Sequence, residues 1–248
     1  YQGCSRPMVN ELVTAEYVHG ETGLDGPHLP APQGAIEQQH AVDYLVETLL
    51  AAEDRSITIC IIGPMTNIAM ALVKEPAIAA KVAEFVIMGG SFHAGGNITP
   101  TAEFNVFVDP HAAHVVFTSG VPLTIMPLDV THQAQATPPR VAAFRVLGPP
   151  VGEAIAAMLD FVEGFDVSHH GFEGFPLHDP TVIAYLIEPE MFEARRGYVS
   201  VVLEPGAGHG MTVADWWGTT GQAPNATVML GVDSDRFYEL LTDLLARL

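Results

Sequence analysis

The sequence predicts an α/β fold with an open, mostly parallel sheet flanked by helices. Short runs of apolar and β-branched residues, such as SITICIIG (56–63) and EFVIMGGS (84–91), are typical of strands covered on both faces. Segments with apolar residues at helical spacing lie between such runs. This alternation favours a parallel sheet, and parallel sheets bind ligands beyond the carboxyl ends of their strands.

The first third of the chain begins with a long segment rich in Gly and Pro. Residues 1–34 are expected to form a loop with a short helical turn near 10–13. An amphipathic helix is expected over 34–52, followed by the strand 56–63. The next helix would be capped by Thr66 or Asn67 and would end at Pro76.

The remaining chain continues the alternation of helices and strands. Further helices are expected over 109–120, from 135 onward with a break at Gly148-Pro149-Pro150, over 181–188, and over 233–248 with Asp233 or Ser234 as its cap. Further strands are expected over 121–131, 196–205 and 225–232. We interpret the 248 residues as a single domain.

Composition excludes several classes of partner. The chain has 29 acidic and 10 basic residues, a net charge of −19, which repels nucleic acid and anionic membranes. Cys4 and Cys60 are too few for a disulfide framework, so we expect a reducing compartment. There is no apolar run of about 18 residues and no basic leader, and we therefore expect a cytoplasmic protein.

The segment NITPTAEFNVFVDPHAAH (97–114) combines polar and apolar residues in a way that suggests a ligand site. Asn97, Glu103 and Asn105 lie among apolar residues, where an unpaired polar group costs about 1–3 kcal/mol. Amides and carboxylates together suit the cis-diol of a ribose. The alternative is a strand entry with Glu103 as a solvated charge, a turn at Asp109-Pro110, and a helix from His111.

Two histidines are candidate site residues. His178 lies beside Asp179 at the start of a helix, and His19 lies in the glycine-rich loop VHGETGLDG. The alternatives are that Asp179 only caps its helix and that His19 is a solvated loop residue. We interpret the other candidates as surface or loop residues: His111, His114, His132, His169 and His170.

Many collinear segments resemble the inosine-uridine nucleoside hydrolases, a family of calcium-dependent N-ribohydrolases. The segments are VTAEYVHGETGLDG, IIGPMTNIAMAL, FVIMGGS, GGNITPTAEFNVFVDPHAAHVVF, LTIMPLDVTHQA, PLHDPTVIAY, GMTVADWWG and DRFYELL. The resemblance covers nearly the whole chain. It implies an open α/β sheet and an enzyme that cleaves the N-glycosidic bond of purine or pyrimidine ribonucleosides, giving ribose and free base through a calcium-bound water.

The resemblance also implies roles for particular residues. Asn97, Glu103 and Asn105 would bind the ribose hydroxyls, and Phe104 would pack beneath the site. Asp179 would bind both calcium and the ribose diol, and the backbone carbonyl of Ile62 would be a second calcium ligand. His178 would assist the leaving base with a pKa near neutrality, and His19 matches a histidine of members that act on pyrimidine nucleosides.

One departure from the family pattern affects the metal. The family's aspartate cluster, D-T-D-x-x-x-D-D, has no match here, which predicts a chain truncated at its N-terminus, without the first strand and helix. Calcium takes about six to eight oxygen ligands, so we expect the chain as given to bind it poorly. The alternative function is a degenerate, non-catalytic protein that binds ribosides. We expect a small-molecule nucleoside as ligand and a homo-oligomer, dimer or tetramer.

Overall fold

The computed structural model describes the backbone of residues 1–248 and all side chains except those of 163–170. The side chains of His169 and His170, expected at the surface, therefore lie outside the described residues. The chain forms two compact units, so the single domain stays a prediction. Unit 1 comprises Tyr1–Leu12, Ala35–Val130 and Phe192–Gly231, and unit 2 comprises Val13–Gly34, Thr131–Met191 and Val232–Leu248.

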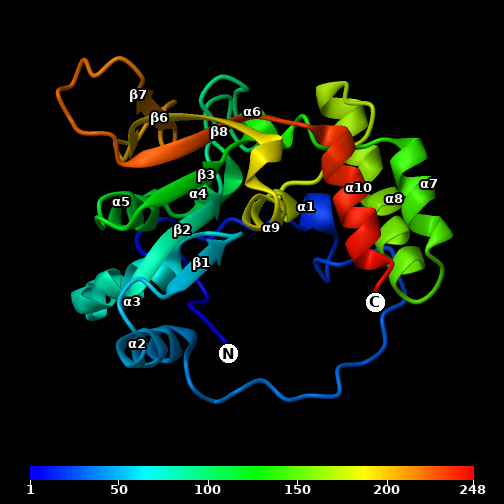
Figure 1. The fold of residues 1–248 in the computed structure, drawn as a ribbon, viewed down its shortest axis with the longest axis horizontal. Helices are drawn as coiled ribbons and strands as arrows, with labels where there is room; N and C mark the ends of the chain where they lie inside the picture. The colour runs from blue at the N-terminus through cyan, green and yellow to red at the C-terminus, as the bar shows by residue number, and fades with distance from the viewer. The chain divides into compact units, whose positions relative to one another are not determined.

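Unit 1 is built on a six-stranded sheet of order β1-β2-β3-β8-β6-β7. The strands β1, β2, β3 and β8 pair in parallel, whereas β6 and β7 pair antiparallel. The prediction of a mostly parallel sheet is thereby confirmed (Figure 1). The strand bounds are β1 (Ile57–Ile61), β2 (Val82–Met88), β3 (Leu123–Met126), β6 (Phe192–Val201), β7 (Thr212–Asp215) and β8 (Ala226–Val232).

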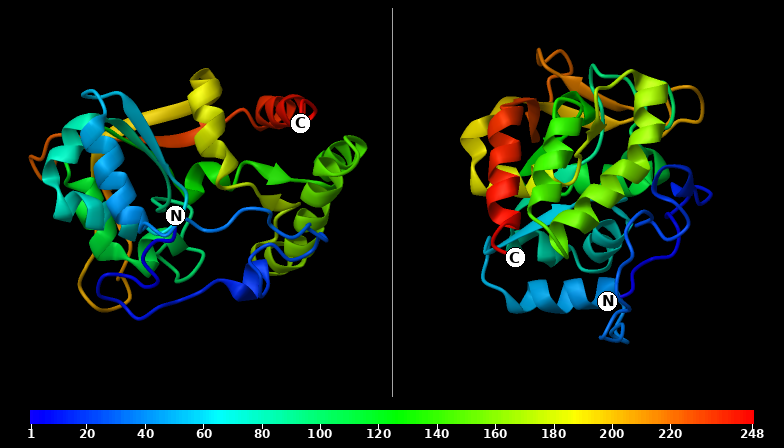
Figure 2. Two further views of the ribbon diagram at one scale, coloured as in Figure 1. Left: turned by 90° about the horizontal axis from the view of Figure 1, so that it is seen from below. Right: turned by 90° about the vertical axis from the view of Figure 1, so that its right-hand side faces the viewer.

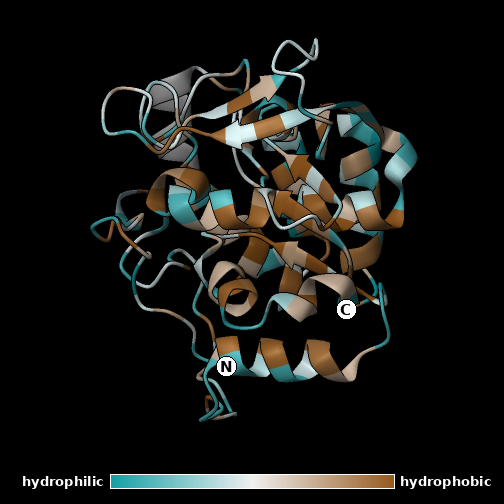
Figure 3. Cartoon of the chain, turned by 90° about the vertical axis from the view of Figure 1, so that its left-hand side faces the viewer, coloured by the Kyte–Doolittle hydropathy of each residue, from teal (hydrophilic) through white to brown (hydrophobic). Residues whose placement is uncertain are grey.

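The core of unit 1 lies where the helices cover the central strands. Val86, Ile87 and Ile125 are all 0% exposed, as expected for strands that are covered on both faces. The apolar strand residues appear in brown in Figure 3. The helices of this unit are α2 (Ala41–Ala51), α3 (Thr66–Lys74), the 3-10 helix η1 (Pro76–Lys81), α4 (Phe104–Val108), α5 (Pro110–Phe117) and α6 (Leu128–Thr131).

Helix α2 is shorter than the predicted 34–52. It begins at Ala41 because the His40 ring accepts a hydrogen bond from the backbone N–H of Val42, which caps the helix at this point. The buried stripe of Val42, Val46 and Leu49 starts only there. The periodic pattern therefore predicts the end of α2 well and its start poorly.

Helix α3 ends as predicted, but neither predicted cap is used. Its N-cap is Met65, and no side chain caps it. The hydroxyl of Thr66 donates instead to Asp109, and the Asn67 Oδ1 accepts from the backbone N–H of Cys4. Residues typical of caps therefore make long-range contacts here.

The segment 97–114 contains no strand, so the predicted strand entry is wrong. Residues Phe104–Val108 form the short helix α4, and α5 follows from Pro110 with Asp109 between them. The apolar run Val106-Phe107-Val108 suits a buried helix as well as a strand, because periodicity does not separate the two in short segments. Glu103 and Asp109 cap these helices, which favours the helical form.

Unit 2 is mainly helical. Its helices α7, α8 and α10 lie side by side (Figure 2, right). The Tyr238 hydroxyl donates to the backbone carbonyl of Ala134 at 3.0 Å, and the Arg140 guanidinium lies 4.2 Å from the Tyr238 ring centroid. The elements are α1 (Glu16–His19), β4 (Gln135–Ala136), α7 (Pro138–Val146), α8 (Val151–His170), β5 (Phe175–Pro176), α9 (Pro180–Ile187), η2 (Pro189–Met191) and α10 (Ser234–Leu245).

Two smaller predictions, one about a helix and one about a strand, also differ from the structure. The helical turn expected near 10–13 lies at Glu16–His19 instead, and the expected strand 121–131 ends at Met126 and continues as α6. The cap of the last helix is confirmed, since the Asp233 carboxylate accepts from the backbone N–H of Arg236. Within the described residues, no helix is long and apolar enough to cross a membrane.

Candidate functional site

Glu103 is a buried carboxylate at the start of α4. It is 2% exposed, so the alternative of a solvated strand-end charge is wrong. Its Oε1 accepts from the backbone N–H of Asn105 at 2.9 Å, and its Oε2 accepts from those of Gly90 at 2.9 Å and Val106 at 3.2 Å. Donors from two different segments therefore offset the cost of burying this charge.

The two amides of the segment are each partly used by the protein. The Asn105 Nδ2 donates to the backbone carbonyl of Met88 at 3.1 Å, and the Asn97 Oδ1 accepts from the backbone N–H of Phe104 at 2.9 Å. Within the described part of the chain, the Asn105 Oδ1 and the Asn97 Nδ2 have no such partner. One amide acceptor and one amide donor therefore remain for a ligand.

Ile62 shares the carboxyl edge of the sheet with this cluster. It follows β1 directly, and the register pairs Ile61 with Ile87, so Ile62 lies level with Met88. The Met88 carbonyl is the acceptor for Asn105. Ile62 is 51% exposed as a residue, so this end of β1 is not covered by the described chain.

Asp109 has a structural role, in agreement with the interpretation as a turn and cap residue. Its carboxylate is 0% exposed. The Oδ2 accepts from the backbone N–H of Met8 at 2.8 Å and from the Thr66 hydroxyl at 2.7 Å, while the Oδ1 accepts from the backbone N–H of Ala112 at 3.0 Å. One carboxylate thus joins the N-terminal segment to the starts of α3 and α5.

Asp179 occupies the N-cap position of α9 without capping it. Its side chain accepts no cap hydrogen bond, so the alternative that Asp179 serves only as a cap is wrong. The residue is exposed as a whole, but the protein around its carboxyl group removes part of its hydration and raises the pKa of Asp179 to about 6. A carboxylate that makes no cap hydrogen bond is free to bind a ligand or a metal ion.

His178 is held by Thr131 in unit 2. Its Nδ1 lies 2.7 Å from the hydroxyl oxygen of Thr131, which is 0% exposed. Burial, and then the positive charges of His132 and His19, lower the pKa of His178 to about 3. The expected pKa near neutrality is therefore wrong, and the ring is an uncharged hydrogen-bonding group at neutral pH.

His132 was expected at the surface or in a loop, and the loop position is confirmed, since it lies between α6 and β4. It is half-buried on the residue after α6, with its ring centroid 6.0 Å from that of His178 and 4.9 Å from that of Phe172. Phe175 also lies 5.9 Å from His178, again between ring centroids. The sequence signal was its position directly after Thr131, where the predicted strand 121–131 ends.

His19 is the last residue of α1 and is exposed. Its charge is the smallest of the three contributions to the lowered pKa of His178. The structure therefore gathers Asn97, Glu103, Phe104 and Asn105 in unit 1, and His19, His178 and Asp179 in unit 2. That these two sets form one site stays a prediction.

The described residues do not form a calcium site by themselves. Among them, no group of three or more His, Cys, Asp or Glu side chains is arranged to hold a metal ion. The Asp179 carboxylate and the Ile62 carbonyl offer fewer oxygens than the roughly six to eight that calcium takes.

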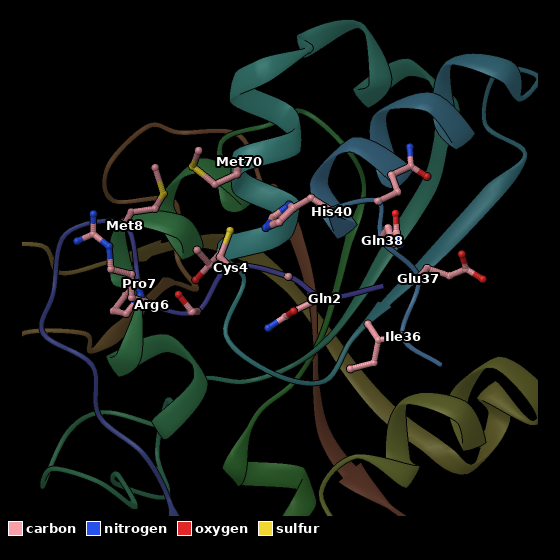
Figure 4. Close-up of a pocket in the computed structure, with 14 residues that line it drawn as sticks. Gln2, Cys4, Arg6, Pro7, Met8, Ile36, Glu37, Gln38, His40 and Met70 are labelled. Carbon is pink, nitrogen blue, oxygen red and sulfur yellow. The ribbon is translucent and has the colours of Figure 1, made fainter. Parts of the chain in front are cut away.

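Two cavities among the described residues are lined by residues other than the predicted ones. A cavity of about 760 Å³ in unit 1 is lined by the N-terminal segment, residues 36–40 and α3, with Cys4, His40 and Met70 among its walls (Figure 4). A second, of about 670 Å³, lies in unit 2 beside Arg140 and Phe172. Neither is lined by a residue predicted to bind ribose or metal.

Comparison with known proteins gives a consistent result. A family model described as inosine-uridine preferring nucleoside hydrolase matches residues 1–239. The pyrimidine-specific ribonucleoside hydrolase RihA of Klebsiella pneumoniae is 44% identical over 245 residues, covering 98% of this chain and 78% of the relative. RihA of Escherichia coli is 45% identical over 244 residues, with the same coverage. An uncharacterized protein of Schizosaccharomyces pombe is 41% identical over 248 residues, covering 100% of this chain and 80% of the relative.

Solved structures of similar proteins share the fold. A purine-preferring ribonucleoside hydrolase from Gardnerella vaginalis superposes with a TM-score of 0.90 at 28% identity, covering 100% of this chain and 79% of the other. A plant nucleoside hydrolase superposes with a TM-score of 0.91 at 28% identity, covering 98% and 79%. The predicted fold class is thus confirmed.

Proposed function

The chain belongs to the inosine-uridine preferring nucleoside hydrolase family, and we propose that it cleaves ribonucleosides to ribose and free base. The RihA relatives and the enzyme from Gardnerella vaginalis are named ribonucleoside hydrolases, enzymes that act on N-glycosyl compounds. The observation in this chain that supports the proposal most is the ordered cluster of Asn97, Glu103 and Asn105 at the carboxyl edge of the sheet. Protein hydrogen bonds fix these groups before any ligand arrives.

The cluster suits the charge that develops during N-glycosidic cleavage. The ribose ring becomes positive as the bond to the base breaks, and fixed carboxylates and amide oxygens stabilise that state more than the ground state. Glu103, Asn97 and Asn105 would hold the ribose hydroxyls, with Phe104 beneath the sugar and Asp179 on the diol. Groups that are already ordered cost little reorganisation when the substrate binds.

The departing base needs a hydrogen-bond donor. We assign this role to His178 first and to His19 second. Because the His178 ring is neutral at ordinary pH, it would donate its single N–H rather than act as a charged acid. The Thr131 hydroxyl fixes the ring orientation through Nδ1.

Membership of the family implies a metal ion, and we propose calcium. The Asp179 carboxylate and the Ile62 carbonyl would be two of its ligands, fewer than the roughly six to eight oxygens that calcium takes. Calorimetric titration of the protein with calcium, compared with Asp179→Ala, tests this assignment. Equal calcium affinity in the two proteins would remove Asp179 from the ligand set.

We propose a preference for pyrimidine ribonucleosides. The RihA relatives carry the name pyrimidine-specific at 44% and 45% identity, whereas the purine-preferring relative is 28% identical. His19 supports this choice through its match to pyrimidine-active members of the family. We further propose a cytoplasmic homo-oligomer, and the free thiols of Cys4 and Cys60 are consistent with a reducing compartment.

An assay of ribose release from uridine and inosine tests the proposed function. We expect Asn105→Ala and Asp179→Ala each to lower turnover by roughly two or more orders of magnitude, as for loss of groups that stabilise the transition state. His178→Ala should impair natural nucleosides more than a nitrophenyl riboside, whose leaving group needs no assistance. Near-wild-type rates for both first variants would remove their assigned roles.

A second candidate function is riboside binding without cleavage. The observation that favours it is that the described residues hold no group of metal-ligating side chains. Calorimetry with uridine separates the two functions. Saturable binding without any release of ribose, in the presence of calcium, would favour the binding protein over the hydrolase.

A further inference from the structure

The turn after β2 is the backbone element that holds Glu103. The Gly90 N–H donates to the Glu103 Oε2 at 2.9 Å, and the Gly90 carbonyl accepts from the backbone N–H of Leu128 at 2.9 Å. Gly90 has φ of 80°, and an added Cβ would lie 3.0 Å from two side-chain atoms of Thr212. The chain therefore passes close to Thr212 in a conformation that favours glycine.

Thr212 fixes this turn from the antiparallel hairpin. Its hydroxyl oxygen accepts from the Ser91 N–H at 2.9 Å and donates to the Ser91 carbonyl at 2.7 Å. Thr212 is 3% exposed and Ser91 is 5% exposed, so water does not replace these bonds readily. One hydroxyl thus satisfies both backbone groups of the residue after Gly90.

Asp129 fixes the next two residues. Its Oδ2 accepts from the Phe92 N–H at 2.8 Å and its Oδ1 accepts from the His93 N–H at 2.7 Å. Bonds to an ionised acceptor are about twice as strong as neutral ones. The backbone of residues 90–93 is therefore held by hydrogen bonds to three side chains from other segments of the chain: Glu103, Thr212 and Asp129.

We infer that Thr212 and Asp129 are positioning residues, which set the turn at 90–93 and through it the Glu103 carboxylate and the Asn105 amide. Glu103 links the two parts, because the carboxylate that accepts from Gly90 also accepts from the Asn105 N–H. The inference deepens the proposed function and rests on it, since Glu103 and Asn105 matter for catalysis only if they contact the ribose. Neither Thr212 nor Asp129 touches the substrate in this scheme.

The first test compares Thr212→Val with Thr212→Ser. Valine keeps the shape but removes both bonds to Ser91, whereas serine keeps the hydroxyl. The matched control is Thr124→Val, a buried threonine on β3 that bonds to Glu84 and lies outside the proposed site. We expect Thr212→Val to lower kcat/KM for uridine about tenfold or more, Thr212→Ser to recover most of it, and Thr124→Val to lose only stability.

Substrate discrimination separates positioning from general damage. Uridine analogues that lack the 2′, 3′ or 5′ hydroxyl are first assayed with wild type and with Glu103→Gln. The analogue whose kcat/KM changes least in Glu103→Gln lacks the hydroxyl that Glu103 contacts. For that analogue, the ratio of kcat/KM for uridine to kcat/KM for the analogue should fall about tenfold in Thr212→Val and in Asp129→Asn. A merely destabilised protein would lower both values and keep the ratio. Asp215→Asn serves as the matched control for Asp129→Asn.

Amide hydrogen exchange reads the same link without substrate. We expect the Gly90 and Ser91 amides to exchange about tenfold faster in Thr212→Val than in Thr124→Val. If wild-type protein neither cleaves nor binds ribonucleosides, the proposed function fails, and this exchange result still decides whether Thr212 fixes the turn. Unchanged exchange at Gly90, or an unchanged discrimination ratio in an active Thr212→Val, would overturn the inference.

Discussion

The hydroxyl of Thr66 donates a 2.7 Å hydrogen bond to the fully buried carboxylate of Asp109, 43 positions away in the sequence. The Asp109 Oδ2, which accepts from Thr66, also accepts from the Met8 N–H, and the Oδ1 caps α5. Three donors therefore converge on one side chain, and each would be left buried without a partner if that side chain were removed.

Asp109→Ala should be strongly destabilising. Loss of the cap and of two further bonds to a buried carboxylate is expected to cost about 3 kcal/mol or more of unfolding free energy. Urea denaturation followed by circular dichroism measures this, with an unchanged m-value as the condition for the comparison. The control is Asp43→Ala, which removes only an exposed ion pair with Lys74 and should leave the midpoint near that of wild type. A midpoint for Asp109→Ala as high as that of the control would contradict the assignment.

Asp179→Ala should separate function from stability. Because Asp179 makes no cap hydrogen bond, its loss should change the unfolding free energy by less than about 0.5 kcal/mol while nearly abolishing ribose release. Asp233→Ala is the matched cap variant, since Asp233 does cap α10, and it should cost about 1 kcal/mol with activity retained. Equal destabilisation of the two variants would indicate a structural role for Asp179.

Ser91→Ala should be neutral or stabilising. The Ser91 Oγ is buried and has no hydrogen-bond partner among the described residues, so removing it relieves a desolvation cost of about 1 kcal/mol. The bonds to Thr212 involve only the Ser91 backbone and persist in alanine. Thermal unfolding checks this prediction. A clear loss of stability would mean that the hydroxyl has a bound water or another partner.

The carboxylate of Asp215 should make stability depend on pH. Hydrogen bonds from the Thr220 backbone and hydroxyl, and then from the backbone of Thr219 and Trp217, hold the pKa of Asp215 well below its usual range. A lowered folded-state pKa adds stability above the unfolded value of about 3.8, and this stability is lost as pH falls through the folded pKa.

The difference in urea midpoint between wild type and Asp215→Asn should therefore be constant from about pH 7 to pH 5 and shrink below about pH 4. Asp243→Asn, a change on an exposed position of α10, should show no comparable trend. A difference that stayed constant down to pH 3 would exclude a lowered pKa as its cause.

The sequence predicted the sheet better than the helix starts. The strands at 56–63 and 84–91 were predicted from continuous runs of apolar and β-branched residues, which have few other interpretations. The observed strands, Ile57–Ile61 and Val82–Met88, lie close to these bounds. The strand entry at 97–114 failed because Phe104–Val108 is short and, apart from Asn105, apolar, so its periodicity does not separate a strand from a helix. Residues suited to caps, such as Thr66, were used for distant contacts that local patterns do not reveal.

The candidate site residues were predicted largely from the resemblance to the family. The contacts that surround them in the structure were not predicted. The burial of Glu103 and the neutral state of His178 depend on neighbours distant in sequence, namely Gly90 in the first case and Thr131 and His132 in the second. Thr212 and Asp129 lie in segments that resemble the family, but neither was predicted as a site residue. Their contacts with the turn span 121 positions for Ser91 and 37 for Phe92, beyond the reach of any sequence window.

The bond between Thr212 and Ser91 also bears on the order of events during translation. A ribosome releases the chain from its N-terminal end at about 5–20 residues per second. The segment that carries Glu103 and Asn105 therefore leaves the exit tunnel well before the hairpin threonine exists, since 121 residues separate the two bonded partners. A nascent polypeptide stalled short of position 212 would carry every sugar-contacting group proposed in unit 1, yet would lack the hydroxyl that fastens their supporting turn.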